Sequence, residues 1–282
     1  MTELDDLRLN EPSEPRPPIL EPPSGPSLLI PAVAIVAIVA IGAAVLLWPK
    51  KAAPPAKAPA TFTEAPVTRA PAPQAEPGEN IDLPPLDETD PLVRQLVSKL
   101  STHPRVAAWL ATNGLLRTFA AVVVNIAEGD TPIKLLTKQR PTAPFTVRGT
   151  AGGAFIDPAS FHRYDAYADA VAGLDARGTA RLYATLKPRI AEAYKELGYP
   201  DADIDGALTR AIIVLLRTPR VGENIAVKRT SVNWQLADPA LEALPRAERQ
   251  LLRMGPRNQQ IIQDKLREIA PLLGIDPARL PQ

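Results

Sequence analysis

Two regions of the chain differ in how apolar and polar residues alternate. From residue 81 to the C-terminus, apolar residues recur three or four positions apart in successive stretches. This is the spacing of helices that bury one face. Before residue 81, prolines interrupt the chain, and only one long apolar run stands out, at 27–48. The pattern therefore predicts a helical globular domain at 81–282, preceded by segments that belong to no domain.

Six stretches of the predicted domain carry a helical apolar stripe. The stripes are Leu92, Leu96 and Leu100; Leu115, Phe119, Val122 or Val123 and Ile126; Phe161, Tyr164, Ala168 and Val171; Leu182, Leu186, Ile190, Ala193 and Leu197; Ile204, Leu208, Ile212 and Leu215; and Ile262, Leu266, Ile269 and Leu273. Glycines at 129, 198 and 274 follow three of them, as expected at helix ends. Pro188 lies inside the fourth stripe and predicts a bend there.

Asp-Pro pairs mark the expected starts of several helices. They occur at 90–91, 157–158, 238–239 and 276–277. Aspartate accepts hydrogen bonds from the free N–H groups of a first turn, and proline suits the first helical position. Asp203 is a further expected cap, for the stripe that begins at Ile204.

Two stretches read as β-structure instead. Ile225 and Val227, and then Val232, Trp234 and Leu236, alternate with polar residues, which favours a short hairpin near 223–236. An isolated strand is expected around 145–147. The fold class is therefore predicted as mainly α, with a minor β-hairpin.

The apolar run from Ser27 to Trp48 has 22 residues and no charged side chain. As a helix it would be about 33 Å long, and the hydrocarbon core of a bilayer is about 30 Å thick. Trp48 ends the run where aromatic side chains prefer the interface, and Lys50 and Lys51 follow. The run predicts one transmembrane helix at 27–48, with the lipid bilayer as its partner.

Two other interpretations of this run are less favoured. A cleaved signal peptide would have a shorter apolar core and a basic rather than acidic segment before it. A buried helix of a soluble domain rarely lacks a polar face. We therefore expect an anchor that is retained.

The segments on either side of the run are poor in core-forming residues. Residues 1–26 hold six acidic residues, two basic residues and seven prolines, which predicts a disordered tail. Residues 49–80 hold eight prolines and nine alanines, which predicts an extended linker. We expect this linker to act as a spacer.

Composition excludes several classes of function. The net charge is +1, and the 26 basic and 22 acidic residues of 81–282 are spread along the chain, so no nucleic-acid partner is indicated. Cysteine is absent, which excludes disulfides, thiolate catalysis and cysteine-ligated zinc.

The two histidines do not indicate a catalytic or metal site. His103 precedes a proline at an expected helix start, which favours a capping role, and two histidines cannot form a three-histidine metal site. Ser160, His162 and Asp165 are close in sequence, but helical positions two apart face different directions. We predict no catalytic residue, no metal ligands and no cofactor.

Two further motifs are better explained by structure than by chemistry. The glycine-rich loop at 149–153 lacks the ending of a phosphate-binding loop, and we expect it to link helices. Asp82, Asp87, Glu88 and Asp90 lack the spacing of a calcium loop, and we expect them to cap and solvate helices. The domain has 22 acidic residues, and the sequence does not indicate which two of them would act together in acid–base catalysis. An enzyme that uses a carboxylate pair therefore stays an alternative.

One corner is a candidate binding site. Gly255 and Pro256 predict that one helix ends and another begins there, with a positive φ at the glycine. Arg253, Arg257 and Asn258 flank the corner, where the N–H groups of a new helix point outward, and this arrangement can bind an anion. A purely architectural corner is the alternative that we favour.

Four phrases of the sequence resemble one family when taken together. They are LPPLDETDPLVRQLV (83–97), VVNIAEGDTP (123–132), LKPRIAEAYKELGYPD (186–201) and WQLADPALEAL followed by QLLRMGP (234–256). The chain resembles the bacterial membrane-anchored family catalogued as domain of unknown function 3014, over residues 80–272. The resemblance implies an envelope protein of a Gram-negative bacterium with no assigned function or catalytic residues.

The sequence as a whole favours a binding or scaffolding domain held at the inner membrane, with an unknown envelope protein or polymer as its partner. The alternatives are an envelope enzyme with carboxylate chemistry and a cytosol-facing membrane adaptor. Three lysines close after the apolar run would place the domain in the cytoplasm by the positive-inside rule. The long linker, the lack of cysteine and the size of the domain favour the opposite orientation, so we predict a periplasmic domain.

Overall fold

The structure, a computed structural model, describes residues 74–150, 153–201, 203–231 and 233–281. The predicted tail at 1–26, the predicted transmembrane helix at 27–48 and the linker as far as residue 73 lie outside these ranges. So does Val232. These assignments stay predictions.

The described part of the chain is mainly helical and has one small sheet. The helices are α1 Asp90–Leu100, α2 Pro104–Leu110, α3 Leu115–Ala127, α4 Pro158–His162, α5 Asp165–Ala172, α6 Ala176–Glu196, α7 Ile204–Leu216, α8 Pro239–Glu242, α9 Arg246–Arg253 and α10 Pro256–Leu272. The strands are β1 Val147–Thr150, β2 Gly153–Ile156, β3 Ala226–Arg229 and β4 Trp234–Leu236. Single 3-10 turns occur at Leu86–Glu88, Thr137–Gln139 and Pro277–Arg279.

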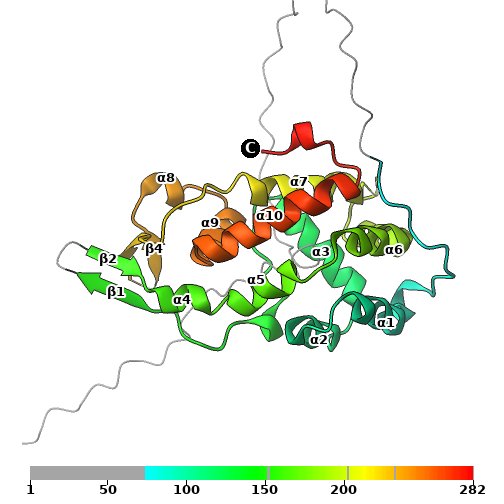
Figure 1. The fold of residues 1–282 in the computed structure, drawn as a ribbon, viewed down its shortest axis with the longest axis horizontal. Helices are drawn as coiled ribbons and strands as arrows, with labels where there is room; N and C mark the ends of the chain where they lie inside the picture. Colours follow the sequence, from blue (N-terminus) through cyan, green and yellow to red (C-terminus); the bar gives the residue numbers. More distant parts are fainter. Residues whose placement is uncertain (1–73, 151–152, 202, 232, 282) are drawn as a thin grey trace, which may run out of the picture.

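Helix α3 is the centre of the fold. It packs along α7 and α6, while α10 packs against α5, α6 and α7. The sheet, α8 and α9 lie at one end of the molecule, and α1, α2 and α6 lie at the other (Figure 1). Ten of the thirteen residues of α3 are buried, which its almost continuous apolar sequence explains.

Most of the predicted helices are confirmed, with two corrections. The stripe that begins at Phe161 predicts one helix, but the chain breaks near Arg163 into α4 and α5. In α1, Val93 is the buried residue, whereas Leu92, Leu96 and Leu100 are only half-buried. The α1 correction has a physical reason, because α1 packs on α6, α2 and α3 at the edge of the molecule and is covered incompletely.

Three of the four Asp-Pro pairs start helical turns as predicted. The side chains of Asp157, Asp238 and Asp276 each accept a hydrogen bond from the backbone N–H two residues later, at 2.8, 2.8 and 2.9 Å. Asp90 acts differently. Its carboxylate accepts hydrogen bonds from the N–H groups of Gly114 (2.8 Å) and Leu115 (2.9 Å), so it caps α3 rather than α1.

The β-structure is more extensive than a single hairpin. The predicted hairpin near 223–236 is confirmed as β3–β4. The strand expected near Val147 is not isolated, because it pairs with β2, and β2 pairs with β3 to give one antiparallel sheet in the order β1-β2-β3-β4. The predicted helix linker at 149–153 is therefore wrong: its described residues belong to β1 and β2.

One face of this sheet is buried. Ile156, Val227 and Leu236 pack with Phe161 of α4 and Leu252 of α9 in a second, smaller core. The sheet forms because two hairpins, separated by α4 to α7 in sequence, share this core.

Within the described ranges, no single helix is both long and apolar enough to cross a bilayer. Taken together, α2 and α3 pass that test on length and composition alone, but they meet at an angle of 109°. The run at 27–48 lies outside these ranges.

The end of the predicted linker contacts the domain. The Glu76 carboxylate forms ion pairs with Arg177 (3.1 Å) and Arg181 (3.2 Å) on α6, and its N–H donates to the Leu272 carbonyl (2.8 Å). Glu79 N–H donates to the Thr185 hydroxyl at 2.7 Å. We call residues 74–83 the strap, because this extended segment runs along α6 before the 3-10 turn at 86–88.

Candidate functional site

The predicted corner between α9 and α10 is formed as expected. Gly255 separates the helices with φ +87° and ψ 159°, a region that glycine alone adopts readily. A Cβ at this position would lie 2.5 Å from Cγ of Phe161. The corner is thus a point of close approach between the α9–α10 junction and α4.

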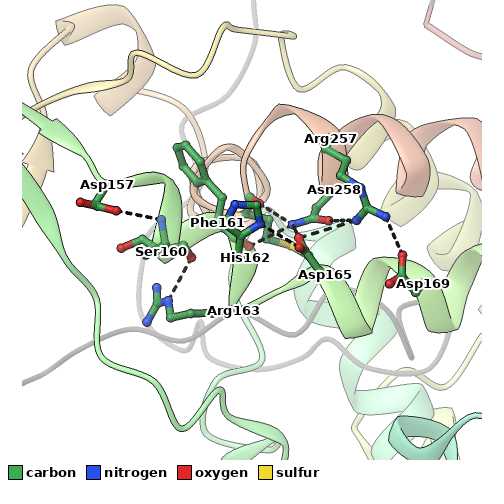
Figure 2. Close-up of polar contacts among 11 residues, drawn as sticks. Asp157, Ser160, Phe161, His162, Arg163, Asp165, Asp169, Arg257 and Asn258 are labelled. Carbon is green, nitrogen blue, oxygen red and sulfur yellow. Dashed lines mark hydrogen bonds and ion pairs between the residues drawn. The ribbon is translucent and has the colours of Figure 1, made fainter.

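The polar groups of this corner have partners within the protein. Arg257 donates to Asp169 (2.8 Å) and to the Asn258 side-chain oxygen (3.0 Å), and it lies 3.6 Å from Asp165. Figure 2 shows these side chains converging between α5 and the start of α10. The hydrogen bond to Asp169 raises the pKa of Arg257 above its ordinary value.

Asn258 is the buried centre of the group. Its Nδ2 group lies within hydrogen-bonding distance of three acceptors: the carbonyls of Phe161 (3.0 Å) and Met254 (2.9 Å) and the Asp165 carboxylate (2.9 Å). The residue is 1% exposed. It therefore ties α4 and α5 to α10, which is an architectural role.

Arg253 points to the sheet instead. It donates to the Trp234 carbonyl at 3.0 Å. Burial lowers the pKa of Arg253, against an opposing effect of Glu242. The structure thus places Arg253 with β4 and brings only Arg257 and Asn258 together, so the anion site stays a prediction whose groups already have protein partners.

Ser160, His162 and Asp165 do not form a catalytic triad. The Ser160 hydroxyl is buried and bonds the backbone N–H (2.7 Å) and carbonyl (2.8 Å) of Thr146. His162, which is exposed, pairs through Nδ1 with Asp165 at 2.9 Å (Figure 2). The nucleophile and the base therefore have different partners.

Other side chains that could take part in catalysis or metal binding also have structural roles. His103 caps α2, with Nδ1 accepting from Arg105 N–H at 3.2 Å. Glu248 is the one buried carboxylate among the described residues, and it pairs with Arg217 at 2.6 Å. Within the same residues, no group of three or more His, Asp or Glu side chains could hold a metal ion.

An apolar cavity of about 100 Å³ lies between α1, α2, α3 and α6. It is lined by Val93, Val97, Leu100, Val106, Trp109, Leu116, Phe119, Leu174, Thr179, Leu182, Tyr183, Leu186 and Ile190. Three lining residues carry polar side-chain atoms: Trp109, Thr179 and Tyr183. The indole N–H of Trp109 is buried without a hydrogen-bond partner among the described residues, whereas both hydroxyls have partners. Thr179 donates to the Asp175 carbonyl (2.7 Å), and Tyr183 donates to Asp205 (2.6 Å).

The cavity opens at the edge of the molecule. Five of its lining residues are half-buried: Val97, Leu100, Leu174, Thr179 and Leu182. They belong to the end of α1, the α5–α6 connection and the first turns of α6. The mouth therefore lies where α1 meets the start of α6.

Such a space suits a small apolar group. Apolar cavities stay dry because water finds no hydrogen-bond partners in them, and they accept small apolar molecules instead. Leaving one empty costs the contacts that its walls would otherwise make. This cavity is therefore a candidate binding site for a small apolar group.

The sequence pattern predicts only part of the walls of the cavity. Five of the lining residues belong to the predicted stripes: Leu100, Phe119, Leu182, Leu186 and Ile190. Val93, Val97, Leu116 and Tyr183 line the cavity but lie outside those stripes. Whether the facing side chains fill the space depends on how four helices meet, and no local pattern reports that.

The model of one family, described as "Protein of unknown function (DUF3014)", matches residues 115–270, more than half of the chain. No curated protein and no solved structure matches the chain.

Proposed function

The chain belongs to the family described as protein of unknown function (DUF3014), and we propose that it is a membrane-anchored binding protein. Its helical domain would take an apolar side chain of an envelope partner into the cavity between α1, α2, α3 and α6. The cavity is the observation that carries this proposal.

The size of the cavity favours a side chain over a free ligand. Pockets for small molecules typically enclose about 300–1,000 Å³, whereas this one is about 100 Å³. The volume of a single leucine or phenylalanine side chain is of the same order as that of the cavity. In protein interfaces, a few such side chains inserted into pockets contribute most of the binding energy.

The anchoring part of the proposal rests on the sequence before residue 74. The uncharged run at 27–48 is long enough to cross a bilayer, and the Pro- and Ala-rich linker keeps the domain within reach of it. We infer that the run spans the inner membrane once and that the domain faces the periplasm, where an envelope partner would meet it.

A side-chain analogue tests the cavity directly. Toluene mimics phenylalanine, and a ligand that binds only the folded state stabilises it by about 1 kcal/mol at five times its dissociation constant. We expect toluene to raise the melting temperature of a 74–282 fragment. Val97→Phe should fill the cavity from its mouth and abolish the shift.

Gln95→Phe is the matched control, because residue 95 lies on the exposed face of the same helix and does not line the cavity. It should leave the toluene response intact. A photo-crosslinking residue at Leu100 should then capture a partner in cells, and Val97→Phe should remove that adduct. If toluene has no effect on the wild type, or has the same effect on all three proteins, the cavity does not bind apolar groups.

A further inference from the structure

The surface loop at 131–140 carries positive charge without a counter-charge. Lys134 and Lys138 are exposed, and neither forms an ion pair with a described carboxylate. The sequence from 131 to 156 contains four basic residues and no acidic one. This differs from α6 and α10, where most lysines and arginines pair with a carboxylate.

An exposed leucine lies between the two lysines. Leu135 is 41% exposed, and it is one of two large apolar side chains among the described residues that are exposed to that degree. The other is Leu197, which is 40% exposed. Exposing a leucine costs hydrophobic free energy in water, so the position suits an apolar partner.

One buried side chain and two hydrogen bonds hold the loop in this position. Leu136 is buried in the main core. The Gln139 carbonyl accepts a hydrogen bond from the Tyr167 hydroxyl (2.8 Å), and the Gln139 side chain donates to the Ala108 carbonyl (3.4 Å). Leu135 is therefore presented outward by a fixed turn.

A polar pocket of about 230 Å³ lies beside the leucine, between this loop and the turn from α2 to α3. Its nine lining residues include no carboxylate; they are Trp109, Thr112, Asn113, Thr118, Leu135, Leu136, Thr137, Lys138 and Gln139. The Asn113 side-chain oxygen accepts from Arg94 (3.2 Å), which leaves its NH₂ group free to donate. Hydroxyl, amide and ammonium donors thus face one space.

We propose that this loop and pocket bind the headgroup of an anionic phospholipid. Phosphate oxygens accept hydrogen bonds only, which matches the donors of Thr118, Thr137 and Asn113, and the charge matches Lys138. Leu135 would enter the apolar edge of the headgroup layer, flanked by ammonium groups that stay at the surface. The domain would then dock on the bilayer that anchors it.

The segment between the apolar run and residue 74 is long enough to let the domain reach back to the bilayer. Twenty-five residues separate the apolar run from residue 74, and as polyproline II they would span about 80 Å. The radius of gyration expected for a domain of this size is about 17 Å. Docking depends on the proposed membrane anchor, which raises the local concentration of lipid, but not on the proposed cavity function.

Because the chain has no cysteine, a single introduced cysteine can be labelled selectively. The full chain would be placed in nanodiscs with one cysteine, Leu135→Cys, labelled with a polarity-sensitive nitrobenzoxadiazole group. We expect blue-shifted emission and protection from acrylamide with phosphatidylglycerol, but not with phosphatidylcholine alone. Leu197→Cys, at the equally exposed leucine, is the matched control and should show neither effect.

Lys134→Gln with Lys138→Gln supplies the charge test. Each basic residue near an anionic surface contributes about a fivefold factor in binding, so the pair should weaken docking roughly 25-fold. Equal shifts at 135 and 197, or a shift that survives the double substitution, would overturn the proposal. So would stabilisation by inorganic phosphate, or protection by an acidic protein, without any response to phosphatidylglycerol.

Discussion

At the scale of single residues, Gly255 shows why one position tolerates no side chain. Its φ of +87° excludes most residues, and the Phe161 ring fills the space where a Cβ would lie. Two independent constraints therefore act on one glycine, and they can be separated experimentally.

We expect Gly255→Ala to destabilise the domain by roughly 2–5 kcal/mol, from backbone strain together with the clash against Phe161. Gly114→Ala is the control, since Gly114 also has a positive φ of +66° but no atom lies within 4 Å of the place where its Cβ would be. That control should cost about 1–2 kcal/mol from strain alone. Chemical denaturation of both variants measures the difference, and equal losses would show that Phe161 yields easily.

Asn258 and Arg257 show that neighbours in sequence can have different roles. Asn258 is buried and joins three elements, whereas Arg257 forms exposed ion pairs, which contribute little to stability. The buried Asn258 therefore has an architectural role, whereas an incoming anion could still reach the exposed Arg257.

At the scale of elements, the strap is part of the folded domain. Glu76 has a side chain only 12% exposed between two arginines of α6. A Cβ on Gly78 would lie 2.6 Å from the Thr185 backbone nitrogen, so the strap approaches α6 more closely than any other residue would allow. The Leu83 carbonyl accepts from Arg189 at 2.8 Å. The strap therefore couples the chain that precedes it to α6.

Removing the strap should lower stability. We expect a fragment that begins at residue 84 to unfold about 2 kcal/mol more easily than one that begins at residue 74, because partly buried ion pairs and hydrogen bonds are lost. Glu76→Gln in the longer fragment removes only the ion pairs. It should therefore reproduce only the part of the loss in unfolding free energy that depends on salt concentration. Identical denaturation midpoints for the two fragments would mean that the strap is bound too weakly to count as part of the domain.

At the scale of the whole molecule, the orientation of the proposed membrane anchor would decide which partners the domain can reach. A domain of about 200 residues translocates largely regardless of flanking charge, so the lysines after the apolar run do not settle the orientation. The proposed lipid site would meet the outer leaflet of the inner membrane if the domain is periplasmic.

Reporter fusions measure this orientation. A C-terminal alkaline phosphatase fusion should be active, because the enzyme needs the oxidising periplasm, and a green fluorescent protein fusion exported by the same pathway should be dark. Deletion of residues 27–48 should abolish the phosphatase activity. The opposite pattern of signals would make this a cytosol-facing protein and would remove the envelope partner from the proposed function.

The sequence by itself determined the elements whose causes are local. Helical stripes, the caps at Asp157 and Asp203, the helix end at Gly255 and the β3–β4 hairpin all depend on residues within a few positions of one another. Periodicity and capping chemistry report such contacts directly.

Tertiary structure alone decided what distant residues do together. The pairing of Ala154 with Val227, the capping of α3 by Asp90, and the cavity enclosed by four helices all join segments far apart in the chain. Strand partners and cavities follow from how whole elements pack, and many sequences with the same stripes could pack differently. The candidate sites lie in this second class, because each is built where separate elements meet.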